Sequence, residues 1–148
     1  MTYTEFFRSL VVLQTELWYH VDGLVREALS LDLANLESLS VLGALEGRGR
    51  VQDLADTIGI TPGAASKLVD RLETRGLVAR QSNPADRRSS VLALTAEGQA
   101  LLAEFSPLLE TILRDRLAPD LDEEQRSRFI ESILVLRQSG KGGDLRRQ

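Results

Sequence analysis

The chain has 148 residues, enough for one domain with a buried core, and its net charge of −4 does not by itself favour a nucleic-acid partner. Its apolar fraction of 43% is typical of a globular protein, and without a membrane-length apolar run or a secretory N-terminus we expect a cytoplasmic protein with no membrane partner. The sequence contains no cysteine, which excludes disulfides, thiolate metal sites and cysteine-based peroxide sensors.

Residues 3–29 are predicted to form a long helix, because apolar side chains recur along them at helical spacing. This apolar stripe is wider than one facing helix needs, which predicts contact both with the rest of the chain and with a partner chain. The stripe consists of Phe6, Leu10, Leu13, Leu17, Val21, Leu24 and Ala28, and is widened by Phe7, Val11, Val25 and Leu29.

Two further helices are predicted over 31–45, capped near Asp32, and over 51–58. Between them, the turn 46–50 contains two glycines that break the helix, together with Arg48 and Arg50. These two arginines either remain solvated or approach a phosphate. The predicted inward positions are Leu36, Leu39, Val41, Leu42 and Leu45 in one helix, and Leu54, Ala55 and Ile58 in the next.

A fourth helix is predicted to begin at Thr61, a good N-cap, with Pro62 in the first helical position and Gly76 at its end. A helix, a short glycine-containing turn and a second helix are typical of a helix–turn–helix motif. The inward face of the fourth helix carries Ala65, Leu68, Val69 and Leu72, and the opposite face carries Gly63, Ala64, Ser66, Lys67, Asp70 and Arg71.

Residues 77–81 and 91–94 are predicted to form two short strands, joined by a polar connection over 82–90 that carries Asp86, Arg87 and Arg88. A small polar helix face beside a basic hairpin is typical of a winged helix that binds DNA. In such a domain the helix N-terminus reads the major groove and a wing arginine enters the minor groove.

The distribution of charge supports this prediction. Residues 48–90 carry eight basic and five acidic side chains, a net charge of +3, and the remainder of the chain has a net charge of −7. Screening limits the reach of charges to about 10 Å at 0.1 M salt, so the local patch decides affinity for phosphates. The acidic flanks then fit a dimerisation region held away from the duplex.

A fifth helix is predicted from the cap Thr95 to about Leu117, with a bend near Phe105 caused by Pro107 rather than a division into two helices. A sixth helix is predicted to begin at Asp122, with Gln125 as capping-box partner. The tail 139–148 is expected to be solvated, or to touch DNA or a partner chain. The apolar positions of the two helices are Leu101, Leu102, Phe105, Leu108, Leu109, Ile112 and Leu113, then Phe129, Ile130, Ile133, Leu134 and Leu136.

Several of these elements occur together at a characteristic spacing, and the run GLVARQSNPADRRSSVLALTAEG resembles the signature of the multiple-antibiotic-resistance regulator (MarR) family. The resemblance implies a mainly α fold with a small β-hairpin wing, in a single domain over 1–148. Within it, 3–30 and 96–138 correspond to dimerisation helices, 33–94 to the winged helix–turn–helix and 139–148 to a tail. The matching residues are Leu72-Glu73, Gly76-Leu77-Val78, Asp86-Arg87-Arg88, Thr95 and Gly98.

The resemblance implies a dimeric, sequence-specific, DNA-binding transcriptional regulator, usually a repressor, that reads a pseudo-palindromic operator in double-stranded DNA and is released by a small-molecule effector. It implies a role for Asp86 in supporting the wing. An effector pocket would lie near Trp18, Tyr19 and His20, which are alternatively interface aromatics beside a hydrogen-bonded histidine. The expected DNA contacts are Thr61, Gly63, Ala64, Ser66, Lys67, Arg71, Arg87 and Arg88.

Two other classes of function remain open from the residues. An enzyme using carboxylates would draw on the acidic cluster over 120–124, but acidic residues are favoured at the start of a helix by its dipole. A winged helix that binds only protein would not need the paired Arg87 and Arg88. No phosphate loop, nucleophile–base pair or metal constellation is recognisable, so no catalytic residue, metal or cofactor is predicted.

Overall fold

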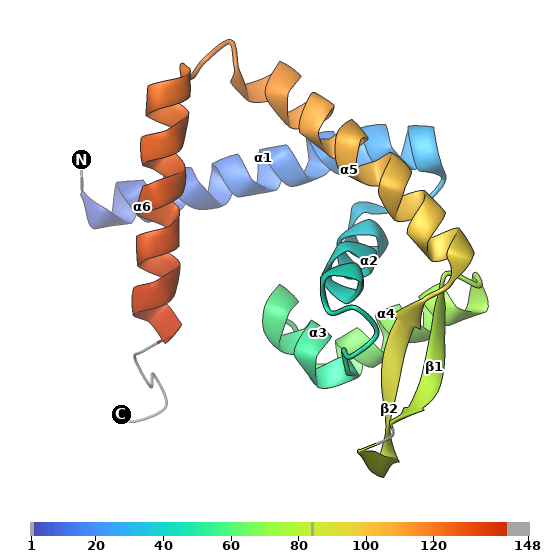
Figure 1. Cartoon of the computed structure of the whole chain (residues 1–148). Coiled ribbons are helices and arrows are strands. Elements are labelled where there is room, and N and C mark those ends of the chain that lie inside the picture. Colours follow the sequence, from blue (N-terminus) through green and yellow to red (C-terminus); the bar gives the residue numbers. More distant parts are fainter. Residues whose placement is uncertain (1, 84, 142–148) are drawn as a thin grey trace. The chain divides into compact units, whose positions relative to one another are not determined.

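The computed structural model describes residues 2–83 and 85–141, without the side chains of residues 87–89 and 139–141. The predicted fold class, mainly helical with one β-hairpin, is confirmed. The chain divides into two compact units, residues 1–110 and 111–148. The elements are α1 (Tyr3–Leu29), α2 (Leu33–Ala44), α3 (Val51–Ile58), α4 (Pro62–Thr74), β1 (Val78–Asn83), β2 (Asp86–Leu94), α5 (Ala96–Leu117) and α6 (Glu123–Lys141) (Figure 1).

Helix α1 has the predicted bounds and begins with a capping box that the sequence reading missed. The backbone N–H of Thr2 donates to Glu5 Oε2 at 2.6 Å, and the N–H of Glu5 donates to Thr2 Oγ1 at 3.1 Å. Hydrogen bonds to the Glu5 carboxyl from the backbone N–H and the side chain of Thr2 lower its pKa. Val21 and Val25 of α1 are buried, whereas most of the predicted apolar stripe is exposed in the single chain.

The core of the first unit lies where α2 packs against α3, α4 and the hairpin, and where α4 packs against β1. The inward faces predicted for α2, α3 and α4 supply most of it, because each helix turns its apolar stripe toward this centre. The deepest core side chains are Leu36, Leu39, Leu42, Leu54, Ala55, Ala65, Val69, Leu72, Val78 and Leu92.

The hairpin strands are longer than predicted, so the expectation of a polar connection over 82–90 is wrong. β1 runs to Asn83 and β2 begins at Asp86, since exposed polar side chains are compatible with a two-stranded ribbon once its backbone ladder forms. The register pairs Ser82 with Ser90 and then Asn83 with Asp86, so β2 bulges over residues 87–89. The strand β2 also forms an isolated bridge with the α2–α3 turn, where Leu92 N donates to Gly49 O at 2.7 Å.

Thr95 caps α5 as predicted, and it also ties the helix to the end of α4. Its Oγ1 accepts from Gly98 N at 3.0 Å and donates to the carbonyl oxygen of Gly76 at 2.6 Å. Helix α5 continues through Pro107, which confirms one helix rather than two, and the bend remains a prediction.

The α6 cap is confirmed in detail. Asp122 N donates to Gln125 Oε1 at 3.0 Å, and Gln125 N donates to Asp122 Oδ1 at 2.8 Å. Because α6 continues to Lys141, the prediction that the tail begins at residue 139 is wrong. Extending a formed helix gains one hydrogen bond per residue, and a single glycine weakens a helix without necessarily ending it. Residues 142–148 lie outside the described part of the chain.

Candidate functional site

The outward face of α4 is built by the residues that begin the helix. Gly59, at a φ of +79°, turns the chain out of α3, and Thr61 Oγ1 then accepts a hydrogen bond from Ala64 N at 3.2 Å. Small side chains follow, so the backbone of the first turn can approach a groove closely. The structure places Thr61, Gly63, Ala64, Lys67 and Arg71 at exposed positions, as predicted, whereas Ser66, predicted to be exposed, is half-buried.

A cluster of charges that the sequence reading missed joins α4 to the base of the hairpin. The Arg80 guanidinium on β1 donates to Asp70 Oδ1 at 2.6 Å and also pairs with the Glu73 carboxylate. The hydrogen bond to Asp70 raises the pKa of Arg80, although partial burial opposes that shift. Because Arg80 lies on β1 and both of its partners lie on α4, no pattern within one helix joins them, and only the fold brings them together.

At the tip of the hairpin, Asp86 is exposed and faces Asn83 in the strand register. Asn83 Oδ1 accepts from Ala85 N at 3.0 Å, which shapes the turn between the strands. The backbone of residues 87 and 88 belongs to β2, and the side chains of Arg87 and Arg88 lie outside the described part of the structure. The wing contacts expected of these arginines therefore remain predictions.

A shallow groove of about 560 Å³ lies between the α2–α3 turn and the wing. Arg48 and Arg50 line its helical side, and Gln81, Ser82 and Asp86 line its strand side. Among the described residues Arg48 pairs with Glu46, at 3.0 Å, and both side chains are about three-quarters exposed, at 77% and 74%. Such a pair is weak, so Arg48 is available to a phosphate beside the wing.

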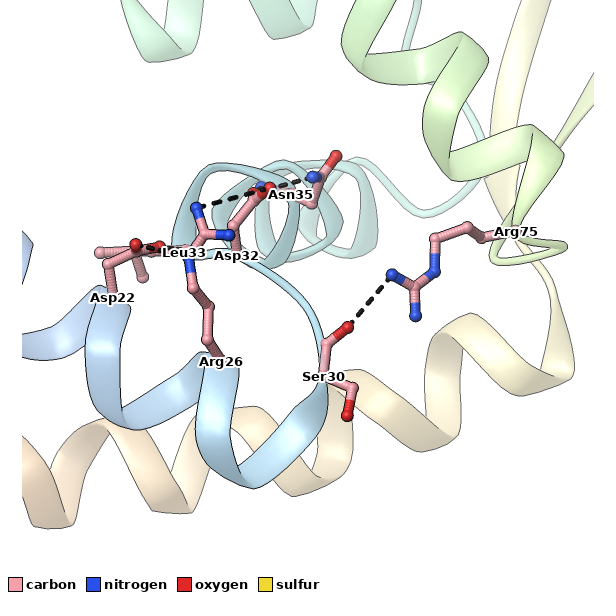
Figure 2. Close-up of polar contacts among 7 residues, drawn as sticks. All are labelled: Asp22, Arg26, Ser30, Asp32, Leu33, Asn35 and Arg75. Atoms are coloured by element: carbon pink, nitrogen blue, oxygen red, sulfur yellow. Dashed lines mark hydrogen bonds and ion pairs between the residues drawn. The ribbon is translucent and has the colours of Figure 1, made fainter.

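The junction of α1 and α2 forms a network of polar contacts that reaches α4 (Figure 2). Asp22 Oδ1 accepts from Leu33 N at 2.8 Å, and its Oδ2 lies 2.6 Å from Arg26 Nε. Partial burial acts to raise the pKa of Asp22, but these hydrogen bonds outweigh it and hold the pKa below its usual range. Arg75, which follows α4, donates to Ser30 O at 3.1 Å and so connects the end of α4 to the end of α1.

A cavity of about 370 Å³ lies at this junction. Its lining includes Arg26, Arg71 and Arg75, one acidic residue, Asp32, and the buried Asn35. The Asn35 amide nitrogen donates to Asp32 Oδ1 at 2.7 Å, whereas its own Oδ1 has no hydrogen-bond partner among the described residues. The cavity therefore presents positive groups together with one unsatisfied acceptor.

Trp18, Tyr19 and His20, the residues proposed for an effector pocket, are exposed on α1 and do not line this cavity. An effector pocket and an aromatic dimer interface both remain predictions for these three residues. Over residues 2–83 and 85–141, no group of three or more histidine, aspartate or glutamate residues is arranged to hold a metal ion. Within the same ranges, no helix combines the length and apolarity needed to cross a bilayer.

Comparison with known proteins identifies relatives of this site. The model of the MarR family matches residues 33–89, which span α2, α3, α4 and most of the hairpin. The chain is 33% identical over 120 residues to the uncharacterized HTH-type transcriptional regulator YcgE of Bacillus subtilis, covering 80% of this chain and 72% of that protein. Two other curated relatives, HosA of Escherichia coli and MdtR of Bacillus subtilis, are matched over 48% and 57% of their own length.

Solved structures resemble the chain over most of its length. Sco3205, a MarR family transcriptional regulator from Streptomyces coelicolor in complex with DNA, has a TM-score of 0.81 at 26% identity, covering 92% of this chain and 86% of that one. The transcriptional repressor CouR, bound to a 23-mer DNA duplex, has a TM-score of 0.78 at 30% identity, covering 87% and 89%. Both of these proteins are bound to DNA in the solved structures.

Proposed function

The chain belongs to the MarR family of DNA-binding transcriptional regulators, and we propose that it acts as a twofold dimer that represses transcription by binding a pseudo-palindromic operator. The observation that carries this proposal is the open N-terminal face of α4 beside the hairpin. Capped by Thr61 and lined by small side chains, this face is suited to enter the major groove. The protein is proposed to do so in the cytoplasm, with no catalytic activity.

Recognition of bases is assigned to the N-terminal half of α4. Gly63, Ala64 and Ser66 allow close approach, and Lys67 is the long donor suited to the O6 or N7 of guanine. Thr61 and Arg71 are assigned to phosphates at either end of this face. On the wing, Arg88 is assigned to the minor groove and Arg87 to a phosphate, with Asp86 holding the tip.

The dimer is supported by apolar side chains that the single chain leaves exposed. On α1, Tyr3 and Phe7 are 94% and 64% exposed, and on α6 Val135 is 62% exposed. Isolated exposed apolar residues are ordinary, but a series of them along a helix marks an interaction surface. Sedimentation equilibrium at micromolar concentration tests this part of the proposal, which predicts twice the mass of the chain and is contradicted by a stable folded monomer.

Release by a small molecule is the remaining part of the proposal. The cavity at the α1–α2 junction supports an anionic effector, because three arginines (Arg26, Arg71 and Arg75) line it against one carboxylate, Asp32, and Asn35 offers an acceptor to a hydroxyl group. An effector that binds there would contact the end of α4 and so change how that helix is held. The alternative site remains the surface of α1 around Trp18, Tyr19 and His20.

Fluorescence anisotropy tests DNA binding directly. Operator fragments are selected from the source genome by the immobilised protein, and the protein is then titrated onto one such fragment and onto an unrelated duplex. We expect nanomolar affinity for the selected fragment, weaker by about 10³-fold or more for the unrelated one, at physiological salt. Equal affinity for both duplexes would reduce the function to non-specific binding, and no binding at low salt would reject it.

A further inference from the structure

We propose that Arg80 is a positioning residue that clamps the wing to the recognition helix α4, and that this clamp sets the wing at the angle needed to engage the minor groove while α4 lies in the major groove. The inference rests on the proposed function for its DNA arm. The test of the structural part of the inference uses the protein without DNA, so its outcome does not depend on that function.

Among the basic side chains of 48–90 that the structure describes, the geometry singles out Arg80. Its two terminal nitrogens reach two carboxylates on α4, Asp70 and Glu73, and its backbone N–H lies 3.4 Å from Glu73 Oε1. One side chain of β1 thus spans two residues that are almost one helical turn apart on α4. The planar guanidinium holds its partners in a fixed fork, which a lysine at this position would not do.

Burial also separates Arg80 from the arginines available to phosphate. The Arg80 side chain is 30% exposed and pairs with the carboxylates of Asp70 and Glu73. The Arg48 side chain is 77% exposed and pairs with one carboxylate. A pair that is partly buried is screened less and loses less side-chain entropy per contact than an isolated surface pair. Arg80 is therefore committed within the protein rather than to the duplex.

The clamp has a second consequence for DNA. Asp70 lies on the same outward side of α4 as Lys67 and Arg71, where a bare carboxylate would repel phosphates. Arg80 neutralises this carboxylate while directing the hairpin. Because the hairpin is a two-stranded ribbon, which has little stability of its own, its direction depends on such contacts at its base.

The structural arm measures the distance between the wing and the helices by double electron–electron resonance. The chain has no native cysteine, so Gln52→Cys on α3 and Ser82→Cys on β1 label only the chosen positions. Mixing the labelled chain with an excess of unlabelled chain keeps the measured pair within one protomer. We expect a narrow distance distribution for the parent, a broadened one for Arg80→Gln, and partial narrowing for Arg80→Lys.

Arg48→Gln is the matched control, since it removes the same charge from a pair that does not join two elements. Its distribution should remain as narrow as that of the parent. If Arg80→Gln also leaves the distribution unchanged, the clamp is refuted, whether or not the protein binds DNA.

The DNA arm separates positioning from phosphate contact and from overall stability. Arg80→Gln should weaken operator binding about tenfold and non-specific binding less than twofold, with an unchanged salt slope, because only simultaneous engagement of both grooves is lost. Urea unfolding should show the variant fully folded under the binding conditions. Equal losses on both duplexes with a slope reduced by about 0.9 would instead make Arg80 a phosphate contact and overturn the inference.

Asp70→Asn decides between the clamp and simple electrostatics. Removing a negative charge beside DNA should tighten binding if only charge matters, whereas the clamp requires weaker operator binding. The double variant Arg80→Gln/Asp70→Asn should bind no worse than Arg80→Gln alone, since both changes break the same contact. Tighter binding by Asp70→Asn, or additive losses in the double variant, would contradict the proposal.

Discussion

The carboxylate of Asp22, on α1, accepts a hydrogen bond from the backbone N–H of Leu33, the first residue of α2, at 2.8 Å. A helix begins with N–H groups that have no partner within the helix, and here the preceding helix supplies one from outside. Asp32 Oδ1 supplies another, to Asn35 N at 2.8 Å. The Asp32 contact caps α2 from within, whereas the Asp22 contact joins α1 to the start of α2 (Figure 2).

The first prediction is that Asp22→Asn destabilises the protein at neutral pH and not at low pH. Because the folded-state pKa of Asp22 is depressed, its stabilisation is present above the pKa of the unfolded chain and is lost as pH falls through the folded pKa. Replacing a charged acceptor by a neutral one should lower the free energy of unfolding by about 1 kcal/mol at pH 7. Urea unfolding at a fixed chain concentration, at pH 7 and pH 3, measures the difference.

Asp120→Asn is the control for this prediction. Asp120 pairs with Arg116 at 3.4 Å four residues away, as Asp22 does with Arg26, but it is 73% exposed. Its replacement should have little effect at either pH. A loss in Asp22→Asn that persists unchanged at pH 3 would show that charge is not responsible.

A second prediction concerns Gly98 at the start of α5. A Cβ atom there would lie 2.1 Å from the carbonyl oxygen of Leu77, so the backbone must move to admit it. Gly98→Ala should cost about 1–3 kcal/mol despite the helix propensity of alanine. At Gly63, a Cβ atom would meet nothing within 4 Å, so Gly63→Ala should be neutral or slightly stabilising in thermal unfolding. Similar effects at both positions would contradict the close approach.

A third prediction tests base recognition by Lys67. Lys67→Ala should weaken operator binding by about 1–3 kcal/mol, because a bidentate contact with guanine is lost. Binding to an unrelated duplex should weaken less, and anisotropy titrations on both duplexes compare the two losses. Equal losses would assign Lys67 to the phosphate backbone.

A fourth prediction tests the wing. Arg88→Ala should weaken operator binding and reduce the salt slope by about 0.9 for each phosphate equivalent lost. Asp86→Ala should weaken binding too, although it removes a negative charge, because the tip would be less ordered before binding. Titration of both variants over a range of salt concentrations gives the slopes. Tighter binding by Asp86→Ala would show that Asp86 affects DNA binding only through its negative charge, which would contradict a role in ordering the tip.

The features that the sequence predicted well are those decided by neighbouring residues. Thr61 and Asp122 cap their helices as expected, because a cap joins a side-chain oxygen to the backbone N–H only three residues away. The inward face of α4 follows from spacing alone. Four of the residues of α4 proposed to contact DNA, Gly63, Ala64, Lys67 and Arg71, are exposed for the same reason.

The features that were missed depend on segments brought together only by folding. The length of the hairpin was misjudged because pairing between Ser82 and Ser90 overrides their polar character. The contacts of Arg80 with α4 and of Arg75 with Ser30 join separate elements, so no local pattern announces them. The apolar stripe of α1 was recognised from its spacing, and much of it is exposed in the single chain. Whether it is covered depends on a second chain, as the proposed dimer requires.

In the proposed complex, two copies of α4 and two wings bind one duplex, and hydroxyl-radical footprinting on a selected operator tests this arrangement. We expect two protected half-sites, separated centre to centre by about one helical turn of 10–10.5 base pairs or a multiple of it, with protected minor groove outside each. Sedimentation of the same complex should give two chains per duplex. A single protected half-site with one chain bound, or no protection at saturating protein, would contradict it.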